Sequence, residues 1–256
     1  MPEFAANLTM MFNEWSFLDR FQAAAEAGFK AVEFLFPYEY PPEAIAQALR
    51  RNHLKPALFN LPPGDWAAGE RGLAALPGRR GDARAALERA LPYIEATGIK
   101  RVHLMAGIAN PDSPAHLSAY LDTVKETAGR LAAYGVSLVL EPINPRDMPG
   151  YFLASLDRAA ALIEQLRIPN LRLQFDIYHC QIIHGDVKMR LRRMMPLVGH
   201  VQIASVPSRN EPDGEELNYP FLFRELDTLG YDGYVGCEYR PRASTLDGLG
   251  WFRALA

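Results

Sequence analysis

Residues 135–142 read GVSLVLEP, and this stretch decides the fold. An amphipathic segment ends at the glycine, and a short apolar run follows it and stops at a glutamate. The same sequence pattern recurs with Gly28 before AVEFLF, Gly98 before RVHLM and Gly230 before YVGCE. Each glycine is typical of the position just after a helix. The apolar runs are too short for helices and are rich in Val, Leu and aromatic residues, which is typical of strands buried on both faces.

Repetition of this sequence pattern along the chain predicts alternating strands and helices. Residues 16–27 and 82–96 have helical periodicity, and the sequence contains no GxGxxG or Walker motif. Eight strand–helix units in 256 residues fit a closed (β/α)₈ TIM barrel better than an open doubly wound sheet. We therefore predict an α/β protein with a single barrel domain over residues 1–256. The predicted strands are 4–7, 31–35, 56–60, 101–105, 137–141, 172–176, 200–203 and 234–238.

Composition and charge exclude several classes of protein. The chain is 49% hydrophobic and 22% charged, with a net charge of −3, and its basic runs are no longer than a pair such as Arg79-Arg80. This charge distribution contains no basic cluster of the kind that binds nucleic acid. Two cysteines cannot form a dense disulfide framework, so we expect the reducing cytoplasm. Residues 1–12 contain Glu3 where an export signal has basic residues, and no run approaches 18 apolar residues, so we expect neither export nor membrane spanning.

Polar residues stand where predicted strands end. The fifth strand is apolar until Glu141, and the eighth is apolar until Glu238. Alternation with period two places Asp176 in the sixth strand and Gln202 in the seventh on one face of each strand. The carboxyl ends of the strands carry the active sites of such barrels. We therefore expect these four side chains to converge at that end.

Three carboxylates in one pocket would repel each other strongly unless a cation lay between them. Oxygen-only ligands suit Mg²⁺ or Mn²⁺, and the lack of clustered Cys and His argues against structural zinc. We therefore predict one divalent cation, Mg²⁺ or Mn²⁺. The predicted ligands are Glu141, Asp176, Gln202 and Glu238.

Several longer motifs carry a family resemblance that covers nearly the whole chain. Together they resemble the hydroxypyruvate isomerase family of the xylose-isomerase-like barrels. In that family the metal ligands and the acid–base pair fall on positions matching Glu141, Asp176, Gln202 and Glu238. Many related sugar epimerases carry histidine where this chain has Gln202. The motifs are FAANLTMMF (4–12), AVEFLFPY (31–38), LPPGDWAAGERGLAALPGR (61–79), LEPIN (140–144), FDIYHCQ (175–181), HVQIA (200–204), SRNEP (208–212), LNYP (217–220), GCEYRPR (236–242) and LGW (249–251).

The resemblance implies an isomerase that converts hydroxypyruvate to tartronate semialdehyde. Such a reaction moves a proton between neighbouring carbons through an enediol, and Glu141 and Glu238 are the predicted acid and base. A hydride shift is the alternative mechanism. A sister branch shares nearly all the motifs and suggests a 2-dehydrotetronate (2-oxo-tetronate) isomerase as the alternative function. A metal-dependent apurinic endonuclease on a related barrel is a distant third, because it should show more histidines and basic loops.

Two further residues are candidates for substrate binding. His179 follows Asp176 by three residues, and Arg209 lies on the long loop after the seventh strand, where a guanidinium can clamp a carboxylate with two hydrogen bonds. His103 and His200 are candidates for the barrel interior, with a packed structural role as the alternative. Cys180, like Cys237, is expected only to pack.

The connections 61–81 and 204–218 are long, and both leave the carboxyl end of a strand. The first contains Trp66, Glu70 and Arg71 and is either a lid over the barrel mouth or a fixed surface loop. We expect a small-molecule hydroxy-keto acid as the partner of the protein. The sequence leaves open the length of that acid, the identity of the metal and whether the chain forms a homo-oligomer.

Overall fold

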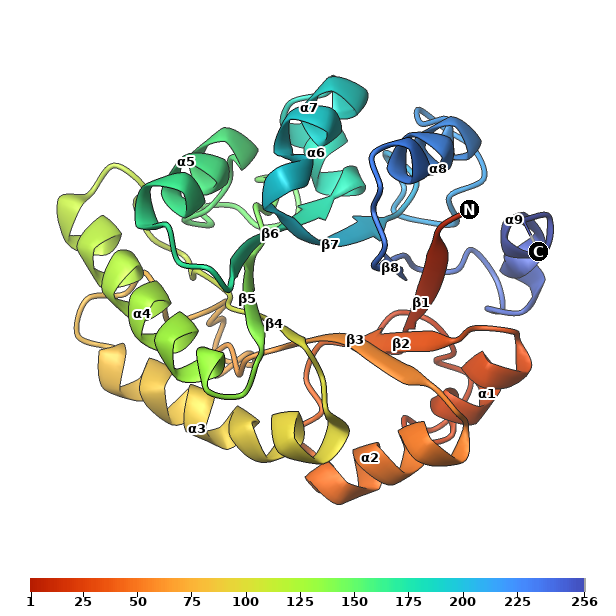
Figure 1. Ribbon diagram of the computed structural model, residues 1–256, viewed down its shortest axis with the longest axis horizontal. Coiled ribbons are helices and arrows are strands. Elements are labelled where there is room, and N and C mark those ends of the chain that lie inside the picture. Colours follow the sequence, from red (N-terminus) through yellow and green to blue (C-terminus); the bar gives the residue numbers. More distant parts are fainter. Residues whose placement is uncertain (256) are drawn as a thin grey trace.

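The computed structural model describes residues 1–255 and shows a closed barrel of parallel strands in the order β1 to β8, with β8 pairing with β1. The helices form a ring outside the strands (Figure 1). This architecture confirms the predicted (β/α)₈ fold. The strands are β1 (Glu3–Asn7), β2 (Ala31–Phe34), β3 (Lys55–Asn60), β4 (Arg101–His103), β5 (Ser137–Leu140), β6 (Leu171–Asp176), β7 (Val198–Ile203) and β8 (Tyr234–Cys237).

The helices pack their apolar faces onto the barrel. Glycines follow several of them as predicted, and Gly98 and Gly135 adopt positive φ values of 68° and 63°, which favour glycine. The helices are α1 (Arg20–Glu26), α2 (Pro42–Arg51), α3 (Arg80–Thr97), α4 (Pro114–Ala132), α5 (Leu156–Leu166), α6 (Ile177–Ile183), α7 (Val187–Met194), η1 (Met195–Leu197), α8 (Tyr219–Thr228), η2 (Asp247–Leu249) and α9 (Gly250–Arg253).

The predicted strand limits were wrong by one or two residues at half of the strand ends. The fifth strand ends at Leu140, not Glu141, because Pro142 has no N–H with which to continue the ladder. The eighth ends at Cys237, where its pairing with β1 ends, and Glu238 follows it. The fourth is shorter than predicted and ends at His103. Both candidate glutamates therefore lie one residue beyond their strands, at the same end of the barrel.

The barrel interior changes from apolar to polar along its axis. Ala5, Ala31 and Ala57 form a small buried apolar cluster, whereas the main core lies between the strands and the surrounding helices. Asn7 and Glu33 lie two residues beyond these alanines on β1 and β2, and further polar residues are buried on other strands, namely His103 on β4, Gln174 on β6, and His200 and Gln202 on β7.

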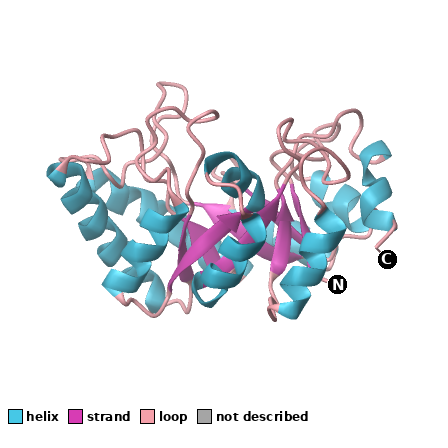
Figure 2. Cartoon of the chain, turned by 90° about the horizontal axis from the view of Figure 1, so that it is seen from above, coloured by secondary structure: helices cyan, strands magenta, loops and turns pink. Residues whose placement is uncertain are grey.

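The longer loops gather at one end of the barrel, where they rise above the strands and helices (Figure 2). The loop after β3 runs to Arg79 and the loop after β7 runs to Asn218, so both predicted long connections are present. The chain termini lie near each other, and Phe4 of β1 packs edge-on against Trp251 of α9 with ring centroids 5.2 Å apart. This contact helps to cover the place where β8 meets β1.

Candidate active site

A cavity of about 1250 Å³ opens at the loop end of the barrel. It is much larger than a three- or four-carbon acid, and its lining combines apolar, acidic and basic side chains. Glu141, Glu238, His179 and Arg209 all line it, so the structure brings together four of the predicted site residues. Asp176 and Gln202 do not line this cavity; both are buried, Asp176 at the end of β6 and Gln202 one residue before the end of β7.

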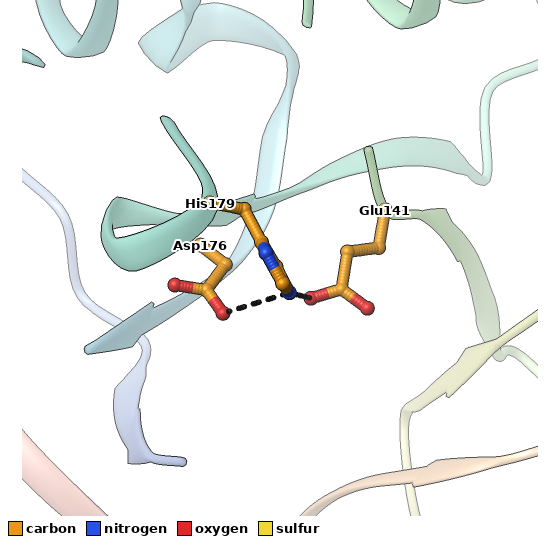
Figure 3. A group of neighbouring side chains, drawn as sticks. All are labelled: Glu141, Asp176 and His179. Carbon is orange, nitrogen blue, oxygen red and sulfur yellow. Dashed lines mark ion pairs between the residues drawn. The ribbon is translucent and has the colours of Figure 1, made fainter. Parts of the chain in front are cut away.

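Glu141, Asp176 and His179 form the centre of the site. One potential ligand atom from each lies within 4.8 Å of the others. His179 Nε2 lies 3.9 Å from Glu141 Oε1 and 3.6 Å from Asp176 Oδ2, and Figure 3 shows both carboxylates directed toward this nitrogen. Asp176 caps α6 by accepting a hydrogen bond from the Tyr178 N–H at 2.7 Å with Oδ1. Its other oxygen therefore stays free to face the site.

The hydrogen bonds of His179 define which ring nitrogen can donate. Nδ1 accepts from the Asn144 backbone N–H at 3.3 Å and lies 2.7 Å from Asn144 Nδ2. A backbone N–H can only donate, so the neutral ring carries its proton on Nε2. Burial, with Arg209 nearby, lowers the pKa of His179 well below its usual value, which favours this neutral form. The arrangement supports a hydrogen-bond donor toward substrate at the predicted position, not a metal ligand.

Arg209 is held by the carboxylates of the site. Its Nη2 lies 2.9 Å from Glu238 Oε2 and 4.0 Å from Asp176 Oδ2, and its Nη1 lies 3.1 Å from Asp147 Oδ2. The guanidinium also lies over the Tyr178 ring, 4.8 Å from its centroid. Arg209 thus balances negative charge inside the site, and the predicted clamp on a substrate carboxylate stays a prediction.

Burial, together with repulsion from neighbouring carboxylates, raises the pKa values of the acidic side chains in the site. Burial, followed by Glu238 and Asp176, raises the pKa of Glu141 well above its usual value. Burial raises the pKa of Glu238 to about 8 and that of Asp176 to about 6, although Arg209 opposes both shifts. Perturbed carboxyls of this kind are typical of catalytic and metal-binding sites.

The donor set fits a hard divalent cation. Glu141 Oε1 and Asp176 Oδ2 are buried without a hydrogen-bond partner in the described chain, so each has an unused acceptor inside the site. A cation between them would satisfy both oxygens and offset the cost of burying two carboxylates. Glu238 is connected to the same cluster through Arg209, whereas the buried amide of Gln202 is hydrogen-bonded to Glu33 and Gln174.

Gln202 is bound on both sides by residues of the barrel interior. Its Nε2 donates to Glu33 Oε1 at 2.8 Å, and its Oε1 accepts from Gln174 Nε2 at 2.6 Å. His200 Nε2 lies 2.7 Å from Glu33 Oε2, so His200 has a hydrogen-bonded structural role. His103 faces the site instead, with Nδ1 3.7 Å from Glu141 Oε2 and no hydrogen-bond partner for either nitrogen among residues 1–255.

Sequence reasoning missed three participants in this arrangement. Glu33 is a single acid inside the apolar run AVEFLF, which is a signal that could have been used. Asp147 and Tyr178 bind each other, with Tyr178 donating to Asp147 Oδ2 at 3.0 Å, and both contact Arg209. Asp147 lies outside the motifs named above, and although Tyr178 lies within FDIYHCQ (175–181), only the tertiary structure shows that both contact Arg209.

Other predictions concern the surroundings of the site. Trp66 and Arg71 of the loop after β3 line the cavity, and the Arg71 guanidinium lies 3.8 Å from the Trp66 ring centroid. The loop therefore borders the mouth, and its motion as a lid stays a prediction. Cys180 and Cys237 are buried, and burial raises the pKa of the Cys180 thiol to about 12, which fits packing residues. No helix in the described part of the chain is both long and apolar enough to cross a membrane.

Comparison with known proteins agrees with this geometry. Residues 21–255 match the family described as the xylose isomerase-like TIM barrel. The chain belongs to this family. In enzymes built on such barrels the active site lies at the carboxyl ends of the strands, which is the end where the cavity opens here.

Several relatives matched over nearly their full length are named isomerases. The 2-oxo-tetronate isomerase of Cupriavidus necator is 56% identical, with 99% of this chain and 98% of the relative covered. The hydroxypyruvate isomerase of Escherichia coli K12 is 40% identical, with 98% of each chain covered. Among solved structures, one described as an AP endonuclease, family 2, from Brucella melitensis is 47% identical, covers 99% of both chains and superposes with a TM-score of 0.97. These matches support the resemblance found in the motifs.

Proposed function

We propose that the protein isomerises a small hydroxy-keto acid, with 2-oxo-tetronate as the preferred substrate and hydroxypyruvate as the second candidate. The observation that carries the proposal is the pair of buried glutamates, Glu141 and Glu238, that line one cavity together with the donors His179 and Arg209. Full-length isomerase relatives support the reaction class.

The reaction removes a proton from a carbon beside a carbonyl and returns it to the neighbouring carbon. Glu141 and Glu238 come from different strands and can take these two roles, one as base and one as acid. Because burial raises the pKa of both side chains, each can exchange a proton nearer to neutral pH than an exposed glutamate can. His179 Nε2–H and the Arg209 guanidinium are positioned to donate to oxygen atoms on which negative charge develops.

Glu141, Asp176, Gln202 and Glu238 are the proposed ligands of one Mg²⁺ or Mn²⁺ ion. When bound, that ion would stabilise the negative charge that develops on the substrate oxygens. The two orphaned carboxylate oxygens in the site support this assignment. The positive charge of Arg209 would offset the negative charge of the carboxylates in contact with it, Glu238 and Asp147.

The choice of substrate rests on the relatives. The motifs alone put hydroxypyruvate first, with tartronate semialdehyde as its product. The relative that is 56% identical is named for 2-oxo-tetronate, whereas the Escherichia coli hydroxypyruvate isomerase is 40% identical. This difference favours the four-carbon acid, which the sequence analysis gave as the alternative.

An endonuclease function stays the distant alternative, suggested by the description of the Brucella structure. A net charge of −3 gives little attraction for a DNA backbone. Direct comparison is still simple, because abasic DNA can be included as a third substrate in the same experiment.

The test is the turnover of 2-oxo-tetronate, hydroxypyruvate and an abasic DNA duplex by the purified protein, in chelator and then in excess Mg²⁺ or Mn²⁺. We expect the highest kcat/KM for 2-oxo-tetronate, loss of turnover in chelator and its recovery with either ion. A higher kcat/KM for hydroxypyruvate would reverse the order of the two acids. DNA cleavage without turnover of either acid would refute the proposed reaction, and full activity in a metal-free sample would refute the metal.

A further inference from the structure

Glu33 is a buried acid at the centre of a hydrogen-bond cluster inside the barrel. Only 1% of its surface is exposed, and it lies on β2, outside the residues that line the cavity. Its Oε1 accepts from Asn7 Nδ2 at 2.9 Å and from Gln202 Nε2 at 2.8 Å, and its Oε2 lies 2.7 Å from His200 Nε2. A buried carboxylate needs several such donors to offset the loss of water.

The neighbouring strands leave space for this carboxylate. A Cβ atom added to Gly236 of β8 would lie 2.2 Å from Glu33 Oε2, so any larger residue there would displace the acid. The pairing of β2 with β3 also shifts register between Val32 and Glu33. Register irregularities of this kind re-aim side chains and are frequent beside functional sites. The backbone is therefore built around the position of Glu33.

A carboxylate can only accept hydrogen bonds, whereas a glutamine amide can turn either its oxygen or its nitrogen toward a neighbour. Contact with Glu33 therefore fixes Nε2 of Gln202 toward β2. Its Oε1 must face the other way, and there it accepts from Gln174 Nε2 at 2.6 Å on β6, the strand that ends at Asp176. An amide oxygen has two lone pairs, so this bond leaves one of them available.

We propose that Glu33 is a positioning residue that keeps the Gln202 carbonyl oxygen turned toward β6, where it can serve a divalent cation. Without Glu33 the amide can invert and present an NH₂ group, which is no ligand for Mg²⁺ or Mn²⁺. The inference rests on the proposed role of Gln202 as a metal ligand. It explains how a glutamine can act in one defined orientation at this position.

The test measures the Kd of Mn²⁺ for the full chain by titration calorimetry and by the loss of the free-ion EPR signal. Glu33→Gln removes the acceptor-only group while keeping its shape, and outer partners of this kind are worth about 10- to 100-fold in metal affinity. We therefore expect Glu33→Gln to raise the Kd of Mn²⁺ by about 10- to 100-fold. The matched control is Asn7→Leu, which removes another donor to Glu33 but leaves Gln202 untouched and should keep the Mn²⁺ Kd within about threefold of the unmodified protein.

A reversed pair separates orientation from general damage. Gln202→Glu supplies an oxygen ligand but sets two carboxylates in contact, whereas the double variant E33Q/Q202E restores a hydrogen bond in which residue 33 donates. We expect the double variant to bind Mn²⁺ at least 10-fold more tightly than Q202E. If E33Q does not fold, this comparison alone decides, and equal affinities would overturn the role of Glu33.

A third variant distinguishes the inference from the proposal beneath it. Gln202→Leu should weaken Mn²⁺ binding if Gln202 is a ligand, and unchanged affinity would refute the ligand set, and with it the role of Glu33. Weaker binding by Gln202→Leu together with unchanged binding by Glu33→Gln would refute only the positioning role of Glu33.

Discussion

Replacing Arg209 by methionine should destabilise the metal-free protein by about 3–5 kcal/mol, the usual cost of removing one partner of a buried ion pair. Arg209 contacts Glu238 at 2.9 Å and Asp147 at 3.1 Å, and its side chain is only 13% exposed. With an effective dielectric of about 20, each contact has a gross attraction of roughly 5–6 kcal/mol. The cost of burying the guanidinium offsets much of that gain, so the loss reflects mainly the acids left without a counter-charge.

Urea unfolding in chelator measures this loss, and thermal unfolding gives a second reading of about 2–4 °C per kcal/mol for a domain of this size. Excess Mn²⁺ should reduce the loss to less than half, because the ion supplies the missing positive charge to the same acids. The control is Arg240→Met, which removes another cavity-lining arginine without an ion pair in the described chain and should change stability by about 0.5 kcal/mol or less.

Two outcomes would refute this reasoning. A loss below about 1 kcal/mol in chelator, similar to that of the control, would mean that Arg209 does not balance the acids. An equal loss with and without Mn²⁺ would mean that the ion binds elsewhere or leaves these acids unaffected.

Three other predictions concern the same acids. Glu141→Gln and Glu238→Gln should each lower kcat by about 100-fold or more with Mn²⁺ bound, because the amide cannot take a proton, and a near-normal kcat in either variant would remove that residue from the mechanism. Burial raises the pKa of Glu238 to about 8 in the folded protein, so between pH 4.5 and 8 this carboxyl holds a proton in the folded state that it loses in the unfolded state; its contribution to metal-free stability should be fully present below the ordinary glutamate pKa near 4.5 and should be lost as the pH rises through 8. Thermal unfolding of the unmodified protein and of Glu238→Gln at pH 5, 6.5 and 8 checks this: in chelator the stability of the unmodified protein relative to the variant should fall over this range, Mn²⁺ should reduce that fall, and a relative stability that rises would contradict the prediction. Turnover in D₂O should place deuterium on the product carbon, and its complete absence over many turnovers would favour a hydride shift.

Much of the fold could be predicted because each strand–helix unit has a recognisable local sequence pattern. A glycine after an amphipathic segment and a short apolar run before a polar residue define a helix end and a buried strand, and Gly98 and Gly135 have the positive φ that this reading requires. Strand limits were less accurate, since pairing with a neighbour and not the sequence decides where a ladder ends. Glu238 illustrates this, because it lies one residue past the point where the pairing of β8 with β1 ends.

The sequence also predicted four of the polar residues that line the cavity, because strand ends and an unusual set of motifs carry them. It could not predict their pairings. Arg209 and Asp147 are 62 residues apart in the chain, and Glu33 and Gln202 are 169 apart, so no local pattern relates them. Such contacts depend on how the barrel closes.

The sequence by itself determined the parallel barrel, the end at which the acids stand and the family, since these follow from local periodicity, glycine positions and motifs. Only the tertiary structure decided that Arg209 pairs with Glu238, that His179 Nδ1 accepts a backbone hydrogen bond and that Gln202 donates to Glu33. The physical reason is that hydrogen bonding and charge balance depend on distances of a few ångströms between strands. Those distances are set by the closure and register of the whole barrel.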